Sequence, residues 1–74
     1  MQRYKAAGGP SGITAFEIGS DSITIEFRHA GTYRYDGTKP GLLHVAKMQR
    51  LAQIGRGLNT YINKYVKDNF AEKL

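Results

Sequence analysis

Residues 23–35 read ITIEFRHAGTYRY, and this stretch decides the fold of the first half of the chain. Its first five residues alternate between large apolar and polar side chains, which is the period of a strand with one buried face. The loop HAG (29–31) suits a three-residue hairpin turn with Gly31 in the left-handed conformation. The sequence therefore predicts an antiparallel hairpin in which TYRY (32–35) returns beside the first strand.

The register of this hairpin decides which face its two tyrosines occupy. A loop at 29–31 places Phe27 opposite Tyr33 and Ile25 opposite Tyr35, on the apolar face. Sheets that bind RNA usually expose their aromatic residues on the open face. The predicted register therefore favours a core role for both tyrosines, with Tyr35 near the edge of the sheet and partly exposed.

A further strand is expected ahead of the hairpin. ITAFEI (13–18) is rich in β-branched and aromatic residues, and the turn GSDS joins it to the hairpin. Phe16 then lies opposite Ile25 on the apolar face. Ile13 falls on the polar face in this register, which indicates a β-bulge near the start of the strand.

After Pro40 the apolar residues recur at helical spacing. One helix is predicted up to residue 53, where IGRG (54–57) ends it, and a second follows, with Phe70 anchoring its end. The expected apolar stripes are Leu42, Val45, Met48, Leu51 and Ala52 in the first helix, and Leu58, Tyr61, Ile62, Tyr65 and Val66 in the second.

These elements predict one α+β domain over residues 1–74, with 1–10 as a flexible N-terminal segment. Its expected architecture is a three-stranded antiparallel β-meander covered on one face by two C-terminal α-helices, in the order β-β-β-α-α. A sheet with one apolar face needs a covering layer, and two amphipathic helices are what the chain offers.

The net charge of +5 is confined to the second half of the chain. Residues 1–38 hold four basic and four acidic side chains, whereas residues 39–74 hold seven basic and two acidic ones. Attraction to a polyanion is therefore expected in the helical half. The alternative is that surface lysines merely keep a small protein soluble.

Several classes of function are excluded at this level. The chain has no cysteine, which removes a disulfide framework and a thiolate metal site. His29 and His44 have no acidic residue at a triad-like or metal-ligand spacing, so neither an enzyme nor a cofactor or metal site is expected. The N-terminus carries no apolar run typical of a signal peptide or membrane span, so we expect a cytoplasmic protein without a membrane partner.

Five basic residues of the helical half are candidates for contacts with phosphate. Lys47 and Arg50 are three residues apart, as are Lys64 and Lys67, so each pair shares a side of its helix. Arg56 lies between the pairs in sequence and offers a forked donor for phosphate. The alternative is that these residues form the solvated outer faces of two core-packing helices.

The GRG motif at 55–57 has two interpretations. Glycines ahead of a helix can present backbone N–H groups to an anion. Gly55 can instead be the C-cap of the preceding helix, and the shortness of the motif favours this structural interpretation.

The motifs together resemble the KTSC domain over about residues 11–70. Tyr33 and Tyr35 match its tyrosine-x-tyrosine pair, and Gly55, Asn59 and Ile62 match its glycine, asparagine and isoleucine. This domain is named for its place at the C-terminus of some lysyl-tRNA synthetases, and it also occurs as a small stand-alone bacterial protein.

The chain also departs from this family pattern at three positions. Gly57 and Leu58 stand where the family often has an aromatic pair, and Gln53 replaces a serine. If those positions contact a ligand in the family, their role does not carry over to this chain.

The resemblance implies an RNA-binding domain. The sequence leads to two hypotheses and leaves a third open, namely a domain that has no strong partner. The first is a non-catalytic nucleic-acid-binding module, with RNA as its partner, in which Tyr33 or Tyr35 stacks at most at the rim. The second is a protein-interaction or homodimerisation module that uses an exposed strand edge or an aromatic patch. The candidate nucleic-acid-binding residues are Lys47, Arg50, Arg56, Lys64, Lys67, Tyr33 and Tyr35.

Overall fold

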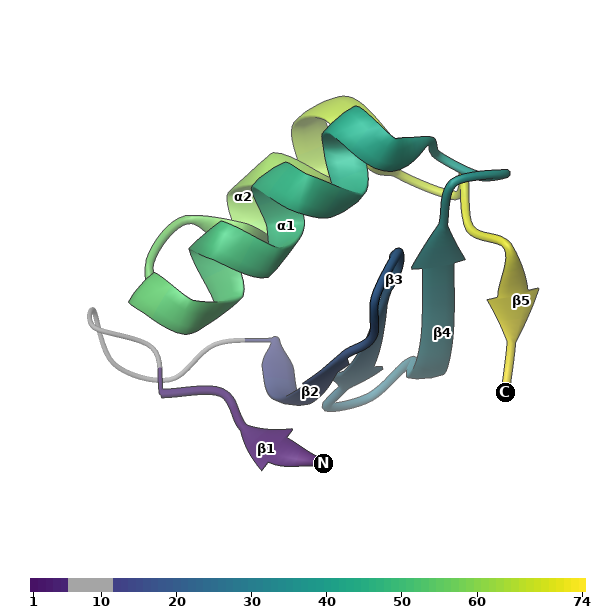
Figure 1. Ribbon diagram of the computed structural model, residues 1–74. Coiled ribbons are helices and arrows are strands. Elements are labelled where there is room, and N and C mark those ends of the chain that lie inside the picture. Colours follow the sequence, from purple (N-terminus) through teal and green to yellow (C-terminus); the bar gives the residue numbers. More distant parts are fainter. Residues whose placement is uncertain (6–11) are drawn as a thin grey trace.

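A computed structural model describes residues 1–5 and 12–74 (Figure 1). The described residues form an antiparallel sheet of five strands in the order β1-β2-β3-β4-β5. The strands are β1 (Gln2–Arg3), β2 (Ile13–Ile18), β3 (Ser22–Phe27), β4 (Gly31–Asp36) and β5 (Glu72–Lys73).

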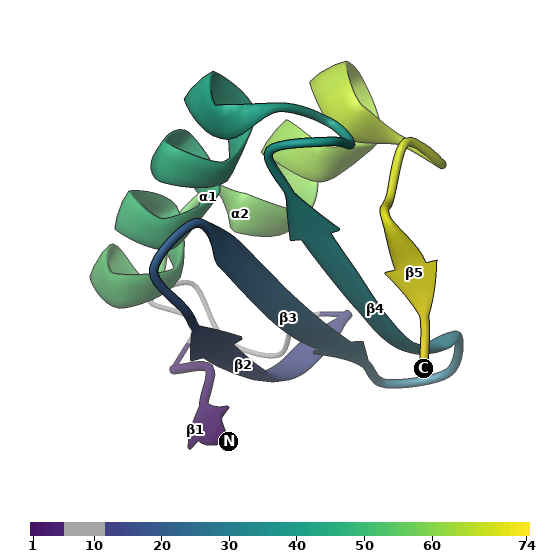
Figure 2. The same cartoon turned by 45° about the vertical axis from the view of Figure 1, so that its right-hand side comes forward.

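The helical layer lies on one side of this sheet, as both views show (Figures 1 and 2). It consists of α1 (Leu42–Ile54) and α2 (Leu58–Tyr61), and α2 continues as a π-helical turn, η1 (Ile62–Val66). Gly55 ends α1 in the left-handed conformation, with φ of 80°, and its N–H donates to the carbonyl of Leu51 at 2.9 Å. The expectation of an antiparallel sheet with two helices is thus confirmed.

The predicted number of strands is wrong, because two short edge strands extend the meander. At one edge β1 pairs with β2, and the N–H of Tyr4 donates to Thr14 at 3.0 Å. At the other edge β5 pairs with β4, flanked by a bond of 2.8 Å from the N–H of Ala71 to Arg34. Strands of two residues are too short to show an alternating pattern, so the sequence carried no signal for them.

The N-terminal segment 1–10, expected to be flexible, is described only in part. Gln2–Arg3 form β1, and Tyr4 is buried in the core at 7% exposure. Residues 6–11 lie outside the described part of the chain.

The predicted register between β3 and β4 is wrong by two residues. Ile25 lies opposite Tyr33, and Ile23 lies opposite Tyr35, because the turn comprises residues 28–30 and Gly31 already begins the strand. Since side chains alternate with a period of two, this shift changes the partners and leaves the faces unchanged. Both tyrosines therefore lie on the covered face, as predicted.

The register between β2 and β3 agrees with the one predicted from the sequence. Phe16 lies opposite Ile25, and the register shifts between Ile13 and Ala15, where a bulge was expected. The bulge returns Ile13 to the apolar face, and its side chain is buried at 2% exposure.

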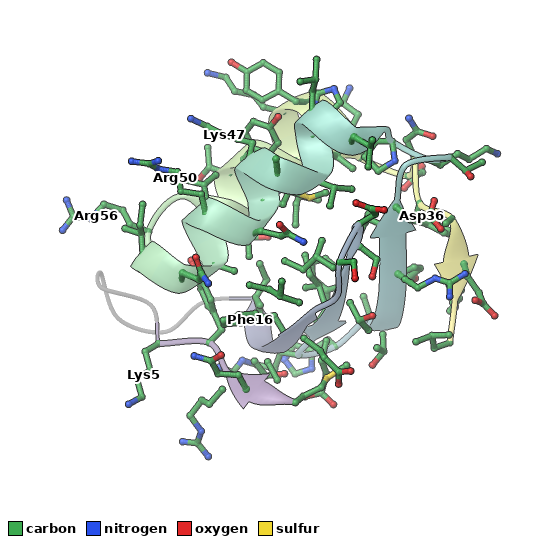
Figure 3. All side chains as sticks on the ribbon, viewed as in Figure 1. Lys5, Phe16, Asp36, Lys47, Arg50 and Arg56 are labelled. Carbon is green, nitrogen blue, oxygen red and sulfur yellow. The ribbon has the colours of Figure 1, made fainter. Side chains whose placement is uncertain are left out.

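The core fills the space between the sheet and the helices. Figure 3 shows Phe16 in this layer, below α1. The core also contains Tyr4, Ile13, Ile23, Ile25, Tyr35, Val45, Met48, Ala52, Leu58, Ile62 and Val66.

Leu51 and Tyr61 of the predicted helical stripes are partly buried against this core, and two further stripe residues are exposed. Leu42 is 56% exposed, because it occupies the first position of α1 and packs against the loop at Gly37. Tyr65 is 61% exposed and lies against the ring of Tyr61 on the outside, with 5.0 Å between centroids. In η1 the backbone hydrogen bonds join residues five apart, which changes the direction in which its side chains point. The buried stripe predicted from α-helical spacing is therefore wrong at Tyr65.

Candidate functional site

Three of the predicted phosphate-binding residues project from one side of the helical layer. Lys47 and Arg50 extend from α1, and Arg56 extends from the connection after it (Figure 3). All three point away from the sheet and are exposed. We refer to Lys47, Arg50 and Arg56 as the basic face.

No described acidic residue neutralises the basic face. Within residues 1–5 and 12–74, none of its three side chains forms an ion pair with an acid. The carboxylates of Asp36 and Glu72 are paired instead with Arg34, at 3.9 Å and 2.9 Å. Asp36 also lies at the opposite end of the molecule from Arg56 (Figure 3). The positive charge of the basic face is therefore available to a partner.

The N-terminal strand brings further positive charge near the end of α1. Arg3 and Lys5 line a small hollow of about 200 Å³ together with Ala52 and Gln53. Sequence reasoning missed Arg3 and Lys5, because the first half of the chain is neutral as a whole. The pairing of β1 with β2 is what places them beside α1.

The two glycines of GRG occupy helix ends, with Gly55 at the C-terminus of α1 and Gly57 at the N-terminus of α2. The N–H of Gly55 is bonded within α1, and the carbonyl of Gly57 accepts from the N–H of Tyr61 at 2.9 Å. Gly55 is thus the C-cap of α1, which agrees with the structural interpretation of the motif. Arg56 belongs to the basic face through its side chain alone.

A second group of predicted residues lines a cavity of about 440 Å³ between the sheet and the second helix. We call it the aromatic cavity. Its lining residues are Phe27, Ala30, Tyr33, Tyr35, Asn59, Ile62, Asn63, Lys67, Asp68 and Phe70.

The aromatic wall of this cavity is a contiguous group of rings. The ring of Tyr33 lies 5.7 Å from that of Phe27 at 71° and 4.6 Å from that of Phe70 at 57°. The ammonium of Lys73 lies 5.7 Å from the centroid of Tyr33. Tyr33 is half-buried at this rim, whereas Tyr35 is only 2% exposed. The expected partial exposure therefore belongs to Tyr33, and the expectation for Tyr35 is wrong.

The polar wall carries amides and charges of both signs. Asn59 and Asn63 lie one turn apart along the second helix, and Lys67 and Asp68 follow its end. Burial raises the pKa of Tyr35 to about 12, with smaller contributions from the neighbouring Tyr33 and Asp68. The phenol of Tyr35 is therefore neutral at physiological pH.

The five predicted basic residues divide between different places. Lys67 lies in the wall of the aromatic cavity, while Lys47, Arg50 and Arg56 make up the basic face. Lys64, on η1, is exposed.

Sequence reasoning missed five residues of the cavity, namely Phe27, Ala30, Asn63, Asp68 and Phe70. Phe27 was assigned to the apolar face of the sheet and Phe70 to the end of the second helix, and the other three carry no recognisable motif. Asn63 lies four residues after Asn59, and this helical spacing was the signal that links it to the family motif.

Four of the five residues that carry the KTSC resemblance meet in the aromatic cavity. They are Tyr33 and Tyr35 from β4 and Asn59 and Ile62 from the second helix, while Gly55 caps α1. No protein-family model, curated protein or solved structure matches this chain. Membership of the KTSC family thus stays a prediction from these motifs.

Among the residues that the structure describes, no helix has the length and apolarity of a membrane span, and no three His, Asp or Glu side chains gather in an arrangement that could hold a metal. His44 contacts Tyr61, with 2.7 Å between Nδ1 and the phenol oxygen.

Proposed function

We propose that this protein is a non-catalytic, cytoplasmic nucleic-acid-binding module of the KTSC type, with RNA as its partner. The observation that supports this most is the basic face, where Lys47, Arg50 and Arg56 project together without an acidic partner among the described residues. The preference for RNA over DNA comes from the family resemblance.

The chemistry of the basic face suits a phosphate backbone. Two guanidinium groups offer forked donors to phosphate oxygens, and a lysine adds a mobile point charge. Binding of this kind releases counterions, so the affinity falls steeply as salt increases. It positions a strand without reading its bases, so the basic face alone confers little sequence selectivity.

The proposal is tested by fluorescence anisotropy with labelled single-stranded RNA and with DNA of the same sequence, each titrated at low and at moderate salt. We expect binding at low salt that weakens as salt increases, and tighter binding of RNA. In an Arg50→Ala/Arg56→Ala variant the affinity should fall by about 100-fold, which corresponds to about 1.5 kcal/mol for each of two lost charged contacts. Absence of binding at low salt, or binding unchanged in this variant, would overturn the proposal.

The matched control keeps the charge at the same two positions. An Arg50→Lys/Arg56→Lys variant should retain most of the affinity, because phosphate attraction depends mainly on charge. A second control, Lys39→Ala, removes a charge from the loop before α1 and should leave binding nearly unchanged.

A second candidate function is protein interaction or self-association. Leu43 is 90% exposed on α1, and Leu42 and Tyr65 are more than half exposed. Exposed apolar side chains of this size are typical of contact surfaces. A molar mass that increases with protein concentration in light scattering, and that falls in a Leu43→Ser variant, would favour this function.

A further inference from the structure

We propose that the aromatic cavity binds one unstacked nucleobase together with its attached phosphate. This inference rests on the proposed function, and it assigns to the cavity the base contacts that the basic face lacks. Proteins that recognise single-stranded RNA take unstacked bases onto aromatic side chains and bond the base edge with polar groups. The aromatic cavity combines both kinds of wall in one place.

The volume and the aromatic wall suit a single base. The cavity of about 440 Å³ lies at the lower end of the range of about 300 to 1,000 Å³ that is usual for small-ligand sites. Phe27, Tyr33 and Phe70 form a continuous aromatic lining, with centroids 5.7 Å and 4.6 Å from that of Tyr33. Such a lining accepts the flat apolar face of a base without selecting its identity.

The polar wall supplies groups for the edge of the base. The amides of Asn59 and Asn63 can donate and accept, and the carboxylate of Asp68 can only accept. Guanine, adenine and cytosine carry an exocyclic amine with two N–H donors, whereas uracil offers the single donor N3–H, so a wall of acceptors favours the amine-bearing bases. We therefore infer that guanine, adenine and cytosine bind better than uracil.

Asn59 lies beside the backbone of Gly12 at the entry to β2. A Cβ atom added at Gly12 would lie 3.4 Å from Nδ2 of Asn59, so the amide is packed against the chain there. Asn63, one turn further along and exposed, is the amide more open to a ligand.

The backbone conformation of Lys67 is a further reason to place a ligand at the cavity. Its φ of 51° and ψ of −121° match the first central position of a type II′ turn, which favours glycine, and the N–H of Asn69 closes this turn onto Val66 at 3.0 Å. A residue with a side chain is strained at such a position, and strained residues of this kind cluster at active sites and ligand-binding sites. Lys67 lines the cavity, and its flexible side chain can bring an ammonium group to the phosphate attached to a bound base.

The test uses a Lys67→Gly variant of the full chain, with Lys39→Ala as a control that removes the same charge from an exposed position outside the cavity. The glycine relieves the strain, so we expect a higher melting temperature together with an affinity for RNA that is about tenfold lower. A residue with a purely structural role would not change stability and binding in opposite directions. Equal loss of affinity in both variants, or unchanged binding in Lys67→Gly, would overturn the inference.

A direct readout comes from ¹H–¹⁵N spectra recorded with the 5′-monophosphates of guanosine, cytidine and uridine. We expect shifts of the side-chain amides of Asn59 and Asn63 with the first two nucleotides and smaller shifts with the third. An Asn63→Ala variant, altered at an exposed position, should weaken these shifts without loss of the fold. No shift in the cavity with any mononucleotide or with an RNA oligomer would overturn the inference.

The two proposals can fail separately. If RNA binds with strong salt dependence but leaves the cavity residues unshifted, the inference fails while the proposed function stands. If mononucleotides shift the cavity residues but no RNA oligomer binds, the proposed function fails and the cavity is supported as a site for free nucleotides. If oligomers and mononucleotides both shift the cavity residues, both proposals are supported.

Discussion

Replacing Lys47, Arg50 and Arg56 together by glutamine should lower the salt dependence of RNA binding by an amount that can be worked out. Glutamine keeps a long polar side chain and a high helix propensity, so α1 should retain its stability. Each phosphate contact on single-stranded nucleic acid contributes a slope of about −0.7 to the plot of log affinity against log salt. Three lost contacts should therefore reduce the slope by about 2.

The same slope predicts how the variant behaves when the salt is changed. Between about 50 mM and about 200 mM salt, these three contacts account for roughly a 20-fold loss of affinity in the native protein. The variant should bind more weakly at low salt and lose less affinity as salt rises. Fluorescence anisotropy with a labelled RNA oligomer at several salt concentrations measures both quantities. A variant whose slope equals that of the native protein would refute the assignment of these residues to phosphate contacts.

Four further predictions concern the stability of the fold. Burial raises the pKa of Tyr35 from 10.0 to about 12, so the folded state holds the phenol proton more tightly than the unfolded state does. Between about pH 9 and about pH 12 the native protein should therefore lose about 2 to 3 kcal/mol of unfolding free energy. A Tyr35→Phe variant should not show this loss. Gly55→Ala should cost about 1 kcal/mol in urea denaturation, because φ is 80° at this C-cap. Lys67→Gly should gain about 1 kcal/mol in the same assay, since φ is positive there. Removal of residues 71–74, which deletes β5, should accelerate hydrogen exchange of the β4 amides.

Each of these predictions has a result that would contradict it. Equal pH dependence in native protein and Tyr35→Phe would mean that the phenol is not buried. An unchanged stability in Gly55→Ala, or a decrease in Lys67→Gly, would contradict the backbone conformations given above. Unchanged exchange of the β4 amides after the truncation would mean that β5 does not protect that edge.

The sequence predicted the central fold because its signals there are periodic. The alternation in β3 and the helical spacing in α1 each define one buried face, and these faces survive an error in register of two residues. It failed at the sheet edges, since β1 and β5 have two residues each. The prediction that Tyr65 is buried was also wrong, because no sequence pattern indicates the π-helical turn.

The candidate site was predictable only in its components. The basic residues of α1 were visible as a pair three residues apart, whereas their relation to Arg56 required the end of α1 to be placed in space. The aromatic cavity joins β4 to the second helix, and contacts between residues so distant in sequence leave no local pattern. The strained turn at Lys67 likewise appears only in the backbone.

The most direct measurement is a ¹H–¹⁵N titration of the protein with a short single-stranded RNA. We predict that the shifted amides lie on the basic face, at Lys47, Arg50 and Arg56, and around the aromatic cavity, and that the shifts on the basic face decrease as salt is added. Shifts confined to the surroundings of Leu43 and Tyr65, or no shifts at low salt, would contradict the proposal that this small domain binds nucleic acid.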